Sequence, residues 1–468
     1  VDRQRWVDML VGACVGACVG ASVASGLLLL LLAEDWLPSV RRRAQRPLEP
    51  EPEPQPSKTL QLVLVLHRHG ARYPKKALAC DLNWPTDEGF WAAHSAEQSA
   101  DGTLQLHGLG GKLRARYGSW LHEGVARCDM ANAVRVLSTN TQRTLNSAWA
   151  LLGALLPGVP RYIRFPTLDR PDVDWASVER RLAGSGETMG VAIEVESGGT
   201  LFHPQKQTVP IDGYDRNEAC LASPELKTMA EDPDVQSAAD ELYAVTGLAS
   251  LAPSLSSSLA AERVIAMKRL ATQLEINSAH GMPRFPTAQP SSALSPDVVR
   301  AVQRAGDVVW RHRYRPVQGA HTGGRRLRDG AASAAAGELG RKIAGLIHEK
   351  QSGVAEKLKL VELSGHTGNL LALAALLGVE VSPPCFAGHW LFELHSSELG
   401  SVADWTVRAF YIPDPTQMSK EDYVDGLTPR RLPLDGKYVP YEECAVDTSL
   451  CGLTPAKQLI DYLLALVD

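Results

Sequence analysis

The stretch Leu60–Pro74, LQLVLVLHRHGARYP, decides the fold of this chain. Its apolar run Leu62–Leu66 has the length of a buried strand in an interior sheet, and a cationic loop follows it directly. Four basic or imidazole side chains stand within that loop and the end of the strand: His67, Arg68, His69 and Arg72. Fixed cations beside an imidazole at the carboxyl end of a strand are suited to holding a phosphate and attacking it.

The segment RHGARYP, residues 68–74, resembles the RHGxRxP signature of the histidine acid phosphatases, the phytase-like branch of the histidine phosphatase superfamily. The related phosphoglycerate mutases have a shorter RHG motif without the second arginine and the proline. The resemblance implies that His69 is the nucleophile and that Arg68 and Arg72 bind the phosphate. Taken alone, the heptapeptide is also compatible with a basic loop at the edge of a sheet.

A second strand and helix are expected at residues 133–152. The strand candidate Ala133–Leu137 precedes STNTQRT, in which Thr139 and Gln142 stand three apart, as in a capping box that begins a helix. Arg143 then falls in the first helical turn, where backbone N–H groups and the helix dipole favour an anion. The segment resembles the family's ST-x-x-x-RT motif, which implies that this arginine is a third phosphate ligand.

A third strand candidate, Leu358–Leu363, leads through SGHTGN into an apolar helix that ends at Gly378. His366 therefore stands at the carboxyl end of a strand, as His69 does. Because doubly wound sheets bind ligands where strand ends converge, we expect the three loops to form one anion pocket. Its expected members are Arg68, His69, Arg72, Arg143 and His366. The resemblance gives His366 a catalytic role, a hydrogen bond to the phosphate.

The family's proton donor has no counterpart in this sequence. The resemblance places an Asp directly after the second histidine, or a Glu two positions after it, and here Thr367 and Gly368 stand there. Neither residue delivers a proton in the useful pH range, although protonating the leaving oxygen is commonly worth about 10²–10⁴-fold. One hypothesis is an active phosphomonoesterase whose acid is Glu393, a carboxylate of a cap lobe or a group of the substrate. The other is a phosphate-binding pseudophosphatase with little turnover. We favour the enzyme, because the nucleophile and the arginine cage are intact.

The chain ahead of the first strand divides into short regions. Residues 1–8 form an N-terminal tail, and residues 9–33 form an uncharged, apolar segment that is long enough to cross a bilayer. Residues 34–57 form a linker that is first basic and then rich in Pro and Glu, which favours an extended stalk. We expect residues 58–468 to form the phosphatase-like domain, with a mostly helical cap lobe inserted at about 165–327.

The apolar segment predicts a single-pass membrane protein, with a homodimer favoured by a small-xxx-small pattern on one helix face: Gly12, Gly16 and Gly20. Basic residues that follow the segment favour a body on the cytosolic side. Six cysteines after the segment are compatible with three disulfides in an oxidising compartment: Cys80, Cys128, Cys220, Cys385, Cys444 and Cys451. Proteins that the chain resembles are mostly secreted, lumenal or on the cell surface. We expect a lumenal or extracellular body, with a cytosolic body as the alternative.

The composition narrows the class of function. A chain of 468 residues with a net charge of −5 gives no support for a nucleic-acid partner, whose binding rests on phosphate neutralisation. No metal-ligand spacing is present and we expect no cofactor, because the arginines already supply positive charge. The sequence therefore predicts an α/β fold with a mainly parallel sheet, flanking helices and a cap lobe. Its expected substrate is a phosphorylated small molecule or another phosphoester.

Overall fold

The computed structural model describes residues 59–76, 81–126, 129–164, 190–196, 224–246, 260–282, 294–312, 331–396, 405–430, 432 and 453–465. Within these residues, one sheet of eight strands has the order β3-β4-β2-β5-β1-β6-β7-β8. Its strands are β1 (Leu60–Arg68), β2 (Val134–Ser138), β3 (Arg161–Arg164), β4 (Val191–Val195), β5 (Leu360–Gly365), β6 (His389–His395), β7 (Thr406–Ile412) and β8 (Leu453–Pro455).

The first strand, β1, is buried on both faces, as its uninterrupted apolar sequence predicts. Successive side chains of a strand point to opposite faces of the sheet. Leu62, Leu64 and Leu66 accordingly join one hydrophobic core, and Val63 and Val65 join the other. Each of the five side chains is exposed by 1% or less. The backbone N–H and C=O groups of β1 pair with β5 on one side and with β6 on the other. The strand therefore forms a fixed base for the loop that follows it.

The register of the parallel strands brings three loops to one edge of the sheet. The strands β3, β4, β2, β5 and β1 are parallel in that order, whereas β6, β7 and β8 are joined by antiparallel pairing. Arg68 at the end of β1 pairs with Gly365 of β5, and Ser138 of β2 pairs with Ser364. The α/β class is therefore confirmed, and the segments that begin after β1, β2 and β5 start at the same level.

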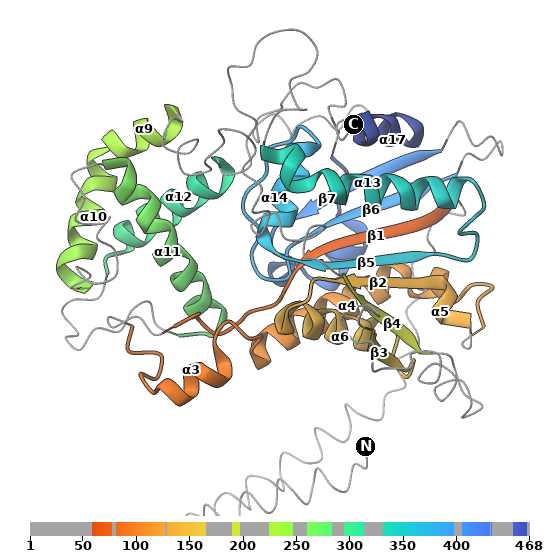
Figure 1. Cartoon of the computed structure of the whole chain (residues 1–468), viewed down its shortest axis with the longest axis horizontal. Helices are drawn as coiled ribbons and strands as arrows, with labels where there is room; N and C mark the ends of the chain where they lie inside the picture. Colours follow the sequence, from red (N-terminus) through yellow and green to blue (C-terminus); the bar gives the residue numbers. More distant parts are fainter. Residues whose placement is uncertain are drawn as a thin grey trace, which may run out of the picture. The chain divides into compact units, whose positions relative to one another are not determined.

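Helices cover both faces of this sheet (Figure 1). On the face of Val63 and Val65 lie α4 (Ala100–His122) and α6 (Gln142–Leu155), while α13 (Ala331–Gln351), α14 (Thr367–Leu376) and α17 (Ala456–Ala465) contribute to the other core. The shorter helical elements are α3 (Glu88–His94), α5 (Met130–Ala133), η6 (Pro415–Gln417) and α15 (Lys420–Asp425). As predicted, Gly378 follows α14 with a φ of 74°, a conformation that glycine adopts without strain.

The start of α6 differs from the predicted capping box. Its N-cap is Thr141, whose side chain makes no capping hydrogen bond. The Gln142 side chain instead accepts a hydrogen bond from the backbone N–H of Gln98, at 2.8 Å. Thr139 remains outside the helix with its hydroxyl 2.8 Å from that of Thr144. The capping-box prediction was therefore wrong, because Gln142 binds the neighbouring loop and Thr139 binds Thr144. Arg143 still stands in the first turn.

In the part of the chain that the structure describes, four helices between β4 and α13 have a hydrophobic core of their own. They are α9 (Pro224–Glu231), α10 (Pro233–Thr246), α11 (Ala260–Ala279) and α12 (Pro296–His312), and we call them the cap helices. Figure 1 shows them grouped together. Strand β4 lies inside the range 165–327 that was predicted for the cap lobe, yet it pairs with β2 and β3 in the sheet. Within the described residues, the cap helices all follow β4 in the chain.

The predictions of a membrane span and of disulfides can be compared with the structure only where it describes the residues concerned. No helix of the described residues has the length and apolar character needed to span a membrane. The predicted span at residues 9–33, with its three glycines, lies outside the described residues. Cys385 is a free thiol, so the prediction of three disulfides among the six cysteines was wrong for Cys385. The other five cysteines named above also lie outside the described residues.

Candidate active site

The loop after β1 fixes the orientation of the His69 ring. The backbone N–H of His69 donates to the Gly365 carbonyl of β5 at 3.0 Å. Its Nδ1 lies 2.8 Å from the carbonyl oxygen of Gly70. Because a carbonyl only accepts hydrogen bonds, Nδ1 carries the proton and Nε2 keeps its lone pair. The ring is thus held as the tautomer that a nucleophile requires.

The surroundings of His69 keep its imidazole neutral. Burial lowers the pKa of His69 well below its ordinary value of 6.5, and the positive charges of Arg143, His366 and Arg68 lower it further. Adding a proton would place another charge next to existing cations in a poorly solvated place. The lone pair of Nε2 therefore stays available in acid solution, where an exposed histidine would be protonated.

Gly70 lets this loop pack directly on the first turn of α4. A Cβ atom at Gly70 would lie 2.1 Å from the backbone oxygen of Gly102, which no real side chain could tolerate. The backbone N–H of Gly70 donates to the hydroxyl of Ser147 in α6 at 3.1 Å. That of Ala71 donates to the Gln105 side chain in α4 at 2.8 Å. The glycine of the motif is thus required by the close approach of two backbones, and α4 and α6 hold the loop in place.

Three guanidinium groups stand close enough to affect one another. Burial and the charges of Arg143 and Arg68 lower the pKa of Arg72 to about 10, against a smaller opposite effect of Glu275. Burial and then Arg68 also lower the pKa of Arg143. With a pKa of about 10, Arg72 remains charged at neutral pH. Among the described residues, the buried Nε atoms of Arg68 and Arg143 find no acceptor. A cluster of mutually repelling, incompletely paired cations favours the binding of an anion.

His366 joins this cluster from the start of α14. It is the N-cap of that helix, and its backbone N–H donates to the Asn369 side chain at 2.9 Å. Its Nε2 lies 3.1 Å from the hydroxyl of Thr139, and its ring centre lies 5.4 Å from that of His69. The structure thus brings together the five residues that the sequence assigned to one anion pocket. They come from the end of β1, from the loops after β1 and β5 and from the first turn of α6.

The position expected for the proton donor holds no acid. Thr367 is the first residue of α14 and is 8% exposed, and Gly368 follows it within the helix. A carboxylate at residue 367 would stand beside His366, but the threonine hydroxyl cannot replace it at ordinary pH. The structure therefore leaves the proton donor to another part of the chain or to the substrate.

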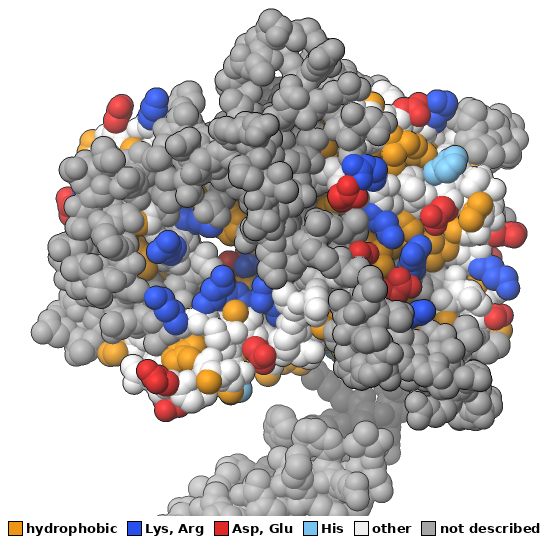
Figure 2. Space-filling model, viewed as in Figure 1, with side chains coloured by type: hydrophobic (Ala, Val, Ile, Leu, Met, Phe, Trp, Pro, Cys, Tyr) orange, Lys and Arg blue, Asp and Glu red, His pale blue; other side chains and the backbone are white. Residues whose placement is uncertain are grey.

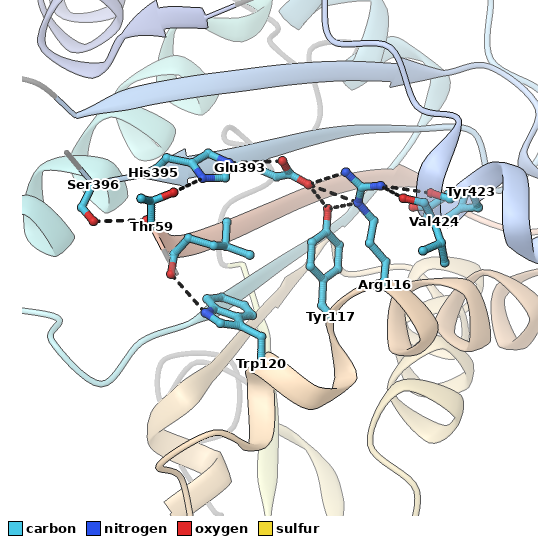
Figure 3. A network of polar contacts seen from close by, with 10 residues as sticks. Thr59, Arg116, Tyr117, Trp120, Glu393, His395, Ser396, Tyr423 and Val424 are labelled. Atoms are coloured by element: carbon cyan, nitrogen blue, oxygen red, sulfur yellow. Dashed lines mark hydrogen bonds and ion pairs between the residues drawn. The ribbon is translucent and has the colours of Figure 1, made fainter. Parts of the chain in front are cut away.

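Glu393 lies apart from this pocket, in a network that Figure 3 shows. The sheet pairs Glu393 with Val63, whereas His67, next to the pocket, pairs with His389. Its carboxylate accepts hydrogen bonds from Arg116 and Tyr117, at 2.8 and 2.6 Å. Despite burial, these bonds and that of His395 lower the pKa of Glu393 to about 2. Since it is remote and firmly ionised, we withdraw Glu393 as a candidate proton donor.

A carboxylate of the cap helices contacts the pocket. The sequence predicted such a carboxylate as a possible acid but did not single out a residue. Glu275 of α11 pairs with Arg68, its Oε1 facing Nη1 and its Oε2 lying 3.1 Å from Nη2. Arg68 also donates to the Pro384 carbonyl at 2.6 Å and lies 4.0 Å from the centre of the Phe386 ring. Figure 2 shows Lys and Arg side chains gathered over α11 and the segment leading to α3. No spacing in the sequence distinguishes Glu275 from other helical glutamates, because its partner is more than 200 positions away.

Comparisons with known proteins bear on the family and the fold of this chain. Residues 59–177 match the model of the histidine phosphatase superfamily (branch 2), which confirms the resemblance inferred from RHGARYP. The lysosomal acid phosphatases of Bos taurus and Homo sapiens are 34% and 33% identical over 114 residues, which is 24% of this chain and 24% of each relative. The chain thus matches about a quarter of the length of these relatives. The phytase of Citrobacter braakii has a TM-score of 0.55 at 16% identity, with 87% of this chain and 98% of that chain covered. The phytase of Hafnia alvei has a TM-score of 0.54 at 15% identity, with 89% of this chain and 98% of that chain covered. At such identities the structures indicate a shared fold alone.

Proposed function

We propose, from its match to branch 2 of the histidine phosphatase superfamily, that this chain is an acid phosphatase-like phosphomonoesterase. It would act through a phosphohistidine intermediate. The observation that carries the proposal is His69, whose Nε2 is unprotonated and whose pKa is lowered by burial and the neighbouring cations. A neutral imidazole beside a cluster of guanidinium groups can attack phosphorus in acid solution.

In the proposed reaction, the guanidinium groups of Arg68, Arg72 and Arg143 bind the non-bridging oxygens of the phosphate. They stabilise the charge that develops there in the transition state. His366 donates a further hydrogen bond. The lone pair of His69 Nε2 forms a bond to phosphorus while the bond to the leaving oxygen breaks, and water later releases the phosphate from the histidine.

A second function, phosphate binding with little turnover, is favoured by one specific observation. The residue after His366 is Thr367, and the described part of α14 offers no acid in its first turn. Without a proton, an alkoxide leaves as a strong base, and its departure is slow. The two functions share the arginine cluster and differ in the proton donor.

Kinetics with the full-length chain in detergent separates these functions. We expect hydrolysis of p-nitrophenyl phosphate, whose leaving group needs no proton, and of an alkyl or inositol phosphate. Rapid quenching into base should trap a phosphohistidine, which is stable there. Binding of inorganic phosphate without hydrolysis of either ester would contradict the enzyme and favour the second function. Hydrolysis of the aryl ester alone would indicate that no donor replaces the missing acid.

We also propose that residues 9–33 anchor the protein in a membrane, with the body on the lumenal or extracellular side. The support is the length and uncharged character of that segment, together with relatives that are named lysosomal acid phosphatases. Protease treatment of sealed vesicles should leave a lumenal body intact until detergent is added. Digestion without detergent would assign the body to the cytosol.

The homodimer is a separate proposal, which rests on the spacing of Gly12, Gly16 and Gly20. Replacing Gly16 with Ile should weaken cross-linking between copies in the membrane, because the larger side chain keeps the two helices apart. Unchanged cross-linking would exclude this helix face as the dimer contact.

A further inference from the structure

The last turns of α11 are fastened to the segment that follows the RHGARYP motif. The carboxylate of Asp81, 2% exposed, accepts hydrogen bonds from Gln273 and Asn277 of α11, each at 2.8 Å. Trp84 donates from its indole to Asn277 at 2.8 Å. Ile276 belongs to a small hydrophobic cluster with Trp84. This end of α11 is therefore held at the pocket by buried contacts. The backbone of Glu275, which lies between Gln273 and Asn277, is held with it.

The carboxylate of Glu275 binds the guanidinium of Arg68, the group that binds phosphate in the proposed function. Both carboxylate oxygens face the two terminal nitrogens of the guanidinium. Of the described residues, no other carboxylate forms an ion pair with Arg68, Arg72 or Arg143. The Glu275 side chain is 30% exposed, so it can exchange a proton with solvent. A phosphate that binds Arg68 must therefore displace this carboxylate or share the guanidinium with it.

Charged groups from several elements surround Glu275. Arg68 ends β1 and Arg72 stands on the loop that follows, Cys385 lies before β6, and Asp307 comes from α12. The charge of Glu275 contributes to raising the pKa of Asp307 to about 6 and that of Cys385 to about 12, in both cases after a larger effect of burial. Negative charge at this place therefore raises the pKa of the neighbouring Asp307 and Cys385 side chains. A bound phosphate would place further negative charge beside the Glu275 carboxylate.

We propose, building on the phosphomonoesterase function, that Glu275 is the proton donor that replaces the acid absent at residue 367. When a phosphate ester binds Arg68, the carboxylate leaves the guanidinium. Repulsion by the phosphate then makes it take up a proton from solvent. The protonated Glu275 remains at the pocket because α11 is fastened there.

The proposed steps balance in both halves of the reaction. The His69 Nε2 lone pair forms the bond to phosphorus, the bond to the leaving oxygen breaks, and that oxygen receives the proton of Glu275. The carboxylate then takes a proton from water as the water oxygen attacks the phosphohistidine. The bond between phosphorus and Nε2 breaks, its electron pair returns to the imidazole, and inorganic phosphate leaves. Glu275 is then protonated, and once the phosphate has left it returns this proton to solvent and pairs with Arg68 again, as at the start of the cycle.

The test compares two esters in wild type and in Glu275→Gln of the full-length chain. We expect kcat for an alkyl phosphate to fall by about 10²–10⁴-fold, because its alkoxide needs the proton. For p-nitrophenyl phosphate we expect a loss below about tenfold, since nitrophenolate leaves unprotonated. Inorganic phosphate should inhibit Glu275→Gln at lower concentration than wild type, because its competitor for Arg68 is neutral. Equal losses on both esters would overturn the proposal and leave Glu275 as a positioning residue for Arg68.

Asp307→Asn is the matched control, since it neutralises the neighbouring cap carboxylate. It should keep the wild-type ratio of alkyl to aryl turnover; a selective loss of alkyl turnover in this variant alone would assign the donor to Asp307 instead. If Glu275→Gln does not fold, Glu275→Asp keeps an acid and should keep measurable alkyl turnover that Glu275→Asn lacks. An identical alkyl-to-aryl ratio in these two variants would overturn the proposal. Wild type that hydrolyses neither ester would contradict the proposed function itself.

Discussion

Two arginine–glutamate pairs join a helix to a central strand, Arg68 of β1 with Glu275 of α11 and Glu393 of β6 with Arg116 of α4, and their surroundings differ. Glu393 accepts hydrogen bonds from Tyr117 and from two nitrogens of Arg116, and its second oxygen lies 3.3 Å from His395. The third nitrogen of Arg116 donates to backbone carbonyls of residues 423 and 424 (Figure 3). Glu275 is bound by Arg68 alone among the described residues and is 30% exposed, against 5% for Glu393.

The difference separates a structural ion pair from one available for chemistry. A buried carboxylate with several donors is fixed in its ionised form, and removing it leaves a buried charge without a partner. A carboxylate with one partner and access to solvent can exchange that partner for a ligand. We therefore expect changes at the pocket to affect turnover more than stability, and changes around Glu393 to affect stability more than turnover.

The largest effect is expected at the pocket, from His69→Ala. Without the nucleophile, turnover of p-nitrophenyl phosphate should fall by about 10⁴-fold or more, as when a nucleophile is removed from other enzymes that form covalent intermediates. The ring makes few bonds that hold the fold, so the urea midpoint should stay close to that of wild type. Residual turnover within tenfold of wild type would show that another group attacks phosphorus.

At the other region, Glu393→Ala should destabilise the fold by about 3–5 kcal/mol, because Arg116 is left partly buried without its carboxylate. Urea denaturation followed by tryptophan fluorescence measures this loss. Turnover per folded molecule should match wild type, since Glu393 lies away from His69. A normal urea midpoint with reduced turnover would reverse the roles of the two regions.

A pH series sharpens the same contrast. The pKa of Glu393 falls from an ordinary value of 4.5 to about 2 in the folded protein, which corresponds to about 3 kcal/mol of stability. Because the folded pKa is the lower one, this stability is present above pH 4.5 and is lost as the pH falls toward 2. In Glu393→Gln, the free energy of unfolding should therefore depend less steeply on pH in that interval. An unchanged slope would show that other carboxylates dominate acid unfolding.

Sequence reasoning was most successful where local pattern and site coincide. The apolar run of β1 and the cations after it are adjacent in the chain, so Leu62–Leu66 could be predicted as a buried strand with an anion loop. Arg143 and His366 could be added because parallel strands end at one edge of a sheet. The first expectation rests on residues adjacent in the chain, and the second adds to local motifs the rule that the ends of parallel strands converge.

Long-range partners could not be predicted in the same way. Glu393 was a reasonable candidate acid by residue type, but its register against Val63 and its bonds to Arg116 are properties of the folded sheet. Glu275 reaches Arg68 because Asp81 fastens α11 to the body, and these residues are far apart in the sequence. The start of α6 was missed because Gln142 binds Gln98 instead of capping its own helix.

The smallest effect is expected from returning an acid to the first turn of α14. Thr367→Asp places a carboxyl beside His366 in nearly the same volume, where it can protonate a leaving oxygen. The N-terminus of a helix lowers the pKa of such a carboxyl, so the gain should be confined to acid solution.

We expect alkyl phosphate turnover at pH 5 to rise by about tenfold in a Glu275→Gln background and by less in wild type, which has its own donor. Aryl turnover should hardly change in either background, and the ratio of the two esters is the measurement. An equal gain in both backgrounds would mean that Glu275 delivers no proton. The absence of any gain would place the leaving oxygen away from α14.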